Sequence, residues 1–172
     1  MNEENPHRHS IRLPEYDYSQ PGAYFITIAA HKKQHLFGEV MNDEMHLNEF
    51  GRILQQVWGT LPSRYPEINL GPFVIMPNHF HGIIEIHGVG AIHELPLPVP
   101  HDPWERRKMT IPLVVGYFKM NTAKSINLAR QTPAQPVWQR NYYEHIIRNE
   151  DEYLQISEYI LANPVMWAVD SQ

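Results

Sequence analysis

Apolar and polar positions along the chain follow two periods, and each period predicts one kind of element. Strict alternation among β-forming residues predicts strands, and apolar residues three or four positions apart predict helices. The expected strands cover residues 23–30, 37–47 (a hairpin that turns at Asn42-Asp43), 68–87, 137–138 and 142–147. The expected helices cover residues 48–61, 110–130 and 150–162.

Capping signals mark the ends of these helices. Asn48 and Thr110 stand where a side chain can cap a first turn. Asn149 with Glu152 three residues later is a variant of the capping box. We expect the last helix to stop before Asn163-Pro164, because a residue that precedes proline is disfavoured in helical conformation.

The order of strands and helices, with hairpin-like connections, predicts an α+β fold: an antiparallel sheet with helices on one face. The 172 residues lie within the usual range for one domain. We expect a single domain over residues 1–172, with a polar N-terminal segment at 1–20. Residues 88–108 are rich in proline and predict an exposed loop.

Two histidines occur in the most apolar stretch of the chain. Val74, Ile75, Ile83 and Ile84 predict a buried strand region with His79-Phe80-His81 at its centre, in two segments bent near Pro77-Asn78. Residues i and i+2 of a strand point to the same face, so both imidazoles should project together while Phe80 enters the core. Such a pair is either half of a divalent metal site or two packed histidines.

The last predicted helix carries two further polar residues. Tyr159 and Asn163 are four positions apart, so they share a face of that helix. A tyrosine beside a two-histidine metal site is a candidate nucleophile, and the Asn163 amide oxygen is a candidate third ligand. Imidazole and amide ligands with open positions suit Mg²⁺ or Mn²⁺. Alternatively, Tyr159 is a packed aromatic residue and Asn163-Pro164 a plain helix stop.

Charge is distributed unevenly. The formal net charge is −5, which argues mildly against nucleic acid as a partner. Between Trp104 and Arg148, however, eight Lys and Arg residues face only two acidic residues. This basic segment could bind a phosphate backbone, or it could be a helix face exposed to solvent.

Composition restricts the class of protein. A hydrophobic content of 42% excludes wholesale disorder, and the absence of cysteine excludes disulfides and thiolate metal sites. We identify no signal peptide and no apolar run of the roughly 20 residues that a membrane helix needs. These features predict a cytoplasmic protein with no membrane partner.

Four sequence blocks resemble one known family. They read "RLPEYDYSQPGAYFITI", "FVIMPNHFHGIIEI", "VWQRNYYEHIIRNEDEY" and "EYILANPV". In order and spacing, along nearly the whole chain, they are similar to the single-tyrosine HUH transposases of the IS200-like class. More narrowly, they resemble the REP-associated tyrosine transposases of bacteria.

The resemblance implies a fold and a chemistry. The fold is a ferredoxin-like antiparallel sheet flanked by helices, with His-x-His on a strand and the nucleophile on the C-terminal helix. His79 and His81 are the implied metal ligands and Tyr159 the implied nucleophile. Asn163 stands where the class often has glutamine as third ligand. The implied reaction is cleavage and rejoining of single-stranded DNA near hairpins, through a covalent 5′-phosphotyrosine.

On this reading the basic segment contacts DNA. The expected backbone contacts come from cations on several elements: Arg12, Lys119, Lys124, Arg140 and Arg148. Two alternatives stay open: a metallohydrolase that uses a metal-activated water, and a non-catalytic or domesticated nucleic-acid-binding module of the same fold. The sequence leaves open whether the protein is a monomer or a homodimer.

Overall fold

A computed structural model describes residues 16–88 and 102–170 of the chain. Its main sheet has four antiparallel strands in the order β4-β5-β1-β6, and β1 pairs with both β5 and β6. The strands are β1 (Gly22–Ala29), β4 (Ile68–Met76), β5 (His79–Ile86) and β6 (Tyr143–Ile147). A separate two-stranded hairpin is formed by β2 (Gly38–Met41) and β3 (Glu44–Leu47).

The helices connect these strands. They are a short 3₁₀ turn η1 (His31–Lys33), α1 (Glu49–Arg64), α2 (Pro103–Arg106), α3 (Thr110–Ala129) and α4 (Glu150–Asp170). Without the β2–β3 insertion and the short turns, the chain runs β-α-β-β-α-β before α4. That connectivity, with this strand order, is the ferredoxin-like arrangement.

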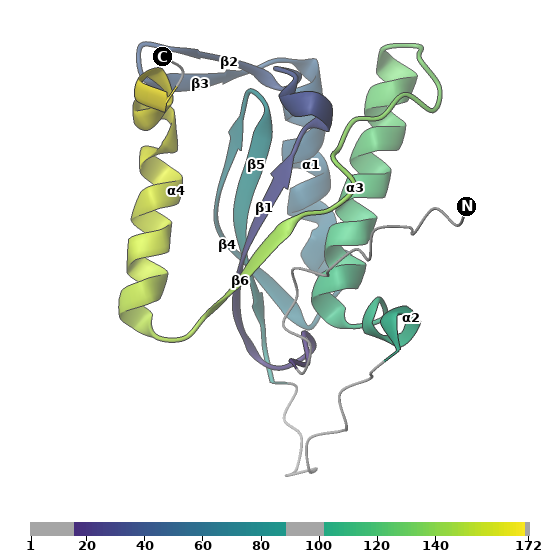
Figure 1. Cartoon of the computed structure of the whole chain (residues 1–172), viewed down its shortest axis with the longest axis vertical. Coiled ribbons are helices and arrows are strands. Elements are labelled where there is room, and N and C mark those ends of the chain that lie inside the picture. The colour runs from purple at the N-terminus through teal and green to yellow at the C-terminus, as the bar shows by residue number, and fades with distance from the viewer. Residues whose placement is uncertain (1–15, 89–101, 171–172) are drawn as a thin grey trace, which may run out of the picture.

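Helices cover both faces of the sheet, so the expectation that they share one face is wrong. Figure 1 shows α1 and α3 on one side of the strands and α4 alone on the other. On the α1/α3 face, residues such as Ile26, Phe80 and Trp58 belong to the larger core cluster. On the α4 face, a smaller cluster is formed by Phe25, Ile83, Ile147 and Ile160. Successive residues of a strand point to opposite faces, and in this sheet both sets are apolar. Each face is therefore buried against a helix.

Several local expectations are confirmed. Asn42 and Asp43 take φ of 51° and 63° in the β2–β3 turn, which is the conformation that a two-residue hairpin requires. The Asn48 side chain caps α1 by accepting a hydrogen bond from the Gly51 amide. The first strand, the helix after Asn48 and the helix after Met109 lie close to their expected bounds.

Other local expectations are wrong. The two expected strand segments that meet at Pro77-Asn78 are present as β4 and β5, but the His pair lies at the start of β5 and not at the centre of a strand. Met109, not Thr110, occupies the N-cap of α3. The expected strand at 137–138 is reduced to one isolated bridge between Trp138 and Ala30.

The C-terminal helix is longer than expected. Helix α4 continues through Pro164 to Asp170 and does not stop at residue 162. Proline removes one helical hydrogen bond, which disfavours this path. Side chains on both sides of Pro164 offset that cost by packing beside β5: Asn163 is buried, and the Trp167 ring lies 5.9 Å from the His79 ring.

Two predicted segments lie partly outside the described residues. The polar segment 1–20 is described only from Tyr16, so Arg12 lies outside it. Of the expected loop 88–108, residues 103–106 form the one-turn helix α2, and 89–101 lie outside the description. Within the described ranges, no helix has the length and apolarity needed to cross a membrane.

Candidate active site

The two histidines lie where β5 leaves the hairpin turn. Their rings are 4.6 Å apart, edge to face, on the side of the sheet that α4 covers. Phe80 between them points to the opposite face and is fully buried, as expected. The Phe25 ring on β1 stacks on His81 at 5.2 Å and holds that imidazole in place.

Hydrogen bonds orient both imidazoles. Asn78 Oδ1 accepts from His79 Nδ1 at 2.7 Å, because an amide oxygen can only accept; this leaves His79 Nε2 with its lone pair. His81 Nδ1 is hydrogen-bonded to the hydroxyl of Thr27, on the neighbouring strand, at 2.8 Å. Outer partners of this kind fix the orientation of metal-binding imidazoles in general.

Burial keeps both imidazoles neutral near pH 7. Desolvation, and after it the charge of the neighbouring His79, lowers the pKa of His81 to about 3. Desolvation is also the main cause that lowers the pKa of His79, while a hydrogen bond with Asn163 acts in the opposite direction. A neutral imidazole is the form that binds a metal ion.

Helix α4 brings Tyr159 to the pair. The Tyr159 hydroxyl lies 3.5 Å from His81 Nε2, and its ring meets the His81 ring edge to face at 5.4 Å. Half of the Tyr159 side chain is exposed, at 51%. The hydroxyl is therefore next to the imidazoles and still open to an incoming substrate.

Asn163 completes the cluster one helical turn later. It is 7% exposed and is hydrogen-bonded to His79. The structure thus brings together the four residues that the sequence singled out for chemistry, two from β5 and two from α4. The contact between His81 and Tyr159 joins residues that are 78 positions apart in the chain.

Few other donors are available for a metal ion. Within residues 16–88 and 102–170, no three His, Asp or Glu side chains gather into a metal-holding group. The available donors are the two Nε2 atoms and the Asn163 amide. Two neutral imidazoles with outer hydrogen bonds and one amide fit a divalent cation that keeps open positions for substrate.

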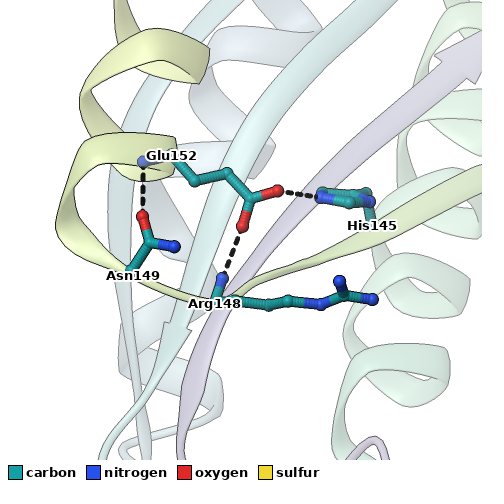
Figure 2. A network of polar contacts seen from close by, with 4 residues as sticks. All are labelled: His145, Arg148, Asn149 and Glu152. Atoms are coloured by element: carbon teal, nitrogen blue, oxygen red, sulfur yellow. Dashed lines mark hydrogen bonds and ion pairs between the residues drawn. The ribbon is translucent and has the colours of Figure 1, made fainter.

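The start of α4 is fastened to the sheet at two points. Glu152 Oε2 accepts from the Arg148 amide and Oε1 contacts His145 Nε2, both at 2.7 Å, while Asn149 Oδ1 accepts from the Glu152 amide at 2.9 Å (Figure 2). One turn along, the Tyr153 hydroxyl donates to Glu85 on β5 at 2.6 Å. These contacts set the position of α4, and so of Tyr159, relative to β5.

The expected DNA-contacting cations are not gathered at this site. Lys119 Nζ already donates to the carbonyl oxygens of Gln139 and Arg140, at 2.8 and 3.0 Å. Lys124 is exposed on α3, on the far side of the sheet from the His pair. Arg140 and Arg148 are exposed near the two ends of β6.

A groove of about 550 Å³ adjoins the His pair. Besides both histidines it is lined by residues that the sequence reasoning missed, among them Lys33, His35 and Trp167. The run His31-Lys32-Lys33-Gln34-His35 directly after a strand was the available signal. Its relevance depends on the tertiary fold, which places that run beside the end of α4.

Comparison with solved structures supports the fold. No model of a known protein family matches the sequence. A solved REP-associated tyrosine transposase bound to a REP hairpin superposes with a TM-score of 0.57 and 18% identity, covering 92% of this chain and 73% of that one. A candidate transposase from Deinococcus radiodurans gives a TM-score of 0.50 and 14% identity, covering 93% of this chain and 95% of that one.

The fold is therefore similar to that of transposases. A nearer relative in sequence is an uncharacterised protein of Haemophilus influenzae, 44% identical over 167 residues, which are 95% of this chain and 92% of that protein. Identity at that level over nearly both whole chains is evidence of common descent. The chain belongs to the same protein family as this Haemophilus influenzae protein, and its fold is similar to that of REP-associated tyrosine transposases.

Proposed function

We propose that this protein is a metal-dependent single-stranded DNA transposase or nickase that uses Tyr159 as its nucleophile. The observation that carries the proposal is the 3.5 Å contact between the Tyr159 hydroxyl and His81 Nε2, beside two neutral, oriented imidazoles. A nucleophile adjacent to a phosphate-orienting group is the arrangement that phosphodiester cleavage requires.

The proposed first step is attack of the Tyr159 oxygen on a DNA phosphorus. The bond to the 3′ oxygen breaks, the phosphate stays on Tyr159 as a 5′-phosphotyrosine, and a 3′-hydroxyl is released. The phenolic proton passes to water, to which this half-exposed side chain is open. A divalent cation bound by His79, His81 and Asn163, Mg²⁺ or Mn²⁺, would neutralise charge on the non-bridging phosphate oxygens.

The second step reverses the first on another strand. The 3′-hydroxyl of a second DNA end attacks the phosphotyrosine, rejoins the DNA and frees Tyr159. The phosphotyrosine retains the energy of the cleaved bond, so neither ATP nor an organic cofactor is needed. This is the chemistry of DNA transposition and recombination.

The proposed partner is single-stranded DNA that carries a hairpin. The structurally similar REP-associated transposase was solved with a REP hairpin, which supports this class of substrate. Arg12, Lys124, Arg140 and Arg148 are the proposed backbone contacts. Lys119 is a further proposed backbone contact. Its ammonium group also has a structural role, because it donates hydrogen bonds to carbonyl oxygens of residues 139–141.

The decisive test is formation of a covalent protein–DNA adduct. We expect the protein, incubated with hairpin DNA that has single-stranded flanks and with Mn²⁺, to give an adduct that resists denaturing electrophoresis. Tyr159→Phe should abolish it. Tyr143→Phe is the matched control, because Tyr143 is equally exposed, at 52%, and lies outside the cluster.

The two alternatives predict different results. Cleavage that survives Tyr159→Phe would identify a metallohydrolase that uses activated water. Tight hairpin binding without cleavage under any divalent metal would identify a non-catalytic binding module.

A further inference from the structure

Of the four clustered residues, only His79 and His81 line the groove beside the His pair. The rest of its lining comes from β1, from the turn before β5, from the 31–35 turn and from α4: Thr27, Ala29, Asn78, Lys33, His35 and Trp167. The groove therefore joins the His pair to residues that the proposed cleavage does not use.

The 31–35 turn has an unusual backbone. Lys32 and Lys33 both have φ of 54°, a left-handed conformation that side-chain-bearing residues rarely adopt, and here two follow one another. Hydrogen bonds from the Lys33 amide to the Ala30 carbonyl, at 3.0 Å, and from Gln34 to His31, at 3.2 Å, hold the turn. Strained backbone of this kind clusters at active sites and ligand-binding segments.

Lys33 brings a positive charge to the groove. It lines the groove together with His79, and its positive charge adds to burial in lowering the pKa of that imidazole. Lys32, its neighbour with the same φ, does not line the groove. Among the described residues, the groove lining contains no acidic side chain, so its charge favours an anion.

Trp167 supplies an aromatic surface at the same place. Its ring lies 5.5 Å from the His35 ring and 5.9 Å from the His79 ring. It follows Tyr159 by eight residues, or about 12 Å along a helix. Only the continuation of α4 through Pro164 brings it there.

We propose that this groove is a nucleotide subsite, in which Trp167 stacks on the base next to the scissile phosphate and Lys33 pairs with the adjoining backbone phosphate. The inference rests on the proposed function and deepens it, by placing the path of the single strand. Aromatic stacking combined with a cation is the general way in which proteins hold unpaired nucleotides.

The test for Trp167 is binding of a REP-type hairpin with a single-stranded flank, in the Tyr159→Phe background, by fluorescence anisotropy. We expect Trp167→Ala to weaken binding about tenfold. Trp167→Phe should recover most of the loss. An abasic nucleotide placed in turn along the flank should reveal one position at which Trp167→Ala has no further effect.

The test for Lys33 is the salt dependence of the same binding. Lys33→Met keeps the length of the side chain, and we expect it to lower the slope of log affinity against log salt by about 0.7, the contribution of one single-strand phosphate. Lys32→Met is the control and should leave the slope unchanged. Thermal denaturation of each variant checks the fold.

The possible outcomes separate the two proposals. If Trp167→Ala weakens binding equally with every abasic probe, or not at all, the subsite is wrong even when the adduct forms. If one abasic position couples to Trp167 but the wild-type protein gives no adduct, the subsite stands and the nuclease proposal fails. No binding of the hairpin by the unsubstituted protein would overturn both.

Discussion

The hydroxyl of Thr27 determines which way the His81 ring faces. Its contact with Nδ1 turns Nε2 toward Tyr159, and Phe25 holds the ring from the side. The sequence spacing predicted that His79 and His81 share a face, because alternation is a local property of a strand. It could not predict Thr27, because that partner depends on the register in which β1 pairs with β5.

We expect Thr27→Val to weaken metal-dependent activity while the protein still folds. Valine has nearly the same shape but lacks the hydroxyl, so the His81 ring loses its outer partner, which typically costs 10–100-fold in metal affinity. Adduct formation measured against Mn²⁺ concentration should shift to higher concentration by roughly that factor. Thr60→Val on α1, where the hydroxyl bonds the Val57 carbonyl, is the control; an equal shift there would contradict the assignment.

At the scale of elements, the candidate site depends on α4, because this helix carries both Tyr159 and Asn163. Periodicity predicted this helix and the shared face of Tyr159 and Asn163. It predicted the end at Pro164 wrongly, because the rule for residues before proline considers local backbone cost alone. The contacts that offset the cost involve residues of β5 and of the 31–35 turn, far away in the sequence.

The first turn of α4 differs from a regular capping box in an informative way. The Asn149 side chain caps the Glu152 amide as expected, but the Glu152 carboxylate bonds the Arg148 amide and His145 (Figure 2). Since β6 carries His145, the same carboxylate caps the helix and ties it to the sheet.

This contact predicts an acid-sensitive helix. The Arg148 amide, and then His145, lower the pKa of Glu152 below its ordinary value of 4.5. The folded state therefore favours the ionised carboxylate, and the stability that this contributes is present above the ordinary pKa and is lost as pH falls through the folded pKa. Urea unfolding of Glu152→Gln should give a lower free energy of unfolding at neutral pH and a flatter decline in acid.

Glu150→Gln provides the comparison for that measurement. Glu150 is an exposed acidic residue in the same helical turn. We expect this variant to keep the acid-dependent decline of the wild type. If Glu152→Gln and wild type lose stability in parallel below pH 4.5, the carboxylate contact contributes nothing.

At the scale of the whole molecule, the sheet separates two kinds of surface. The His pair and Tyr159 lie on the α4 face, while α3 with Lys124 lies across the sheet (Figure 1). The charge pattern indicated a basic segment but could not say that its cations would be divided between α3, across the sheet from the His pair, and the two ends of the edge strand β6. The fold, and not the count of charges, determines which of them can reach one DNA molecule.

Cleavage and hairpin binding should therefore be separable. We expect His79→Ala to abolish adduct formation and to change the affinity for a hairpin without a single-stranded flank by no more than about twofold, because the proposed contacts with the hairpin backbone lie on other residues. Arg140→Ala should weaken hairpin binding and reduce its salt slope by about 0.9, the value for one duplex phosphate. Anisotropy titrations at several salt concentrations measure both; equal loss of folding and binding in His79→Ala would make the pair structural.

The sequence by itself determined the features that depend on near neighbours. These are the strand and helix periods, the shared face of His79 and His81, the Asn48 cap, and the one-turn spacing of Tyr159 and Asn163. Spacing within an element is enough for such features, because strand and helix geometry are local.

Only the tertiary structure decided how those pieces combine. It placed α4 alone on its face of the sheet, continued that helix through Pro164, and put the Tyr159 hydroxyl 3.5 Å from His81 Nε2. It also brought Lys33 and Trp167 to the same groove. These contacts join residues far apart in the chain, so they depend on strand register and helix docking, which no local pattern encodes.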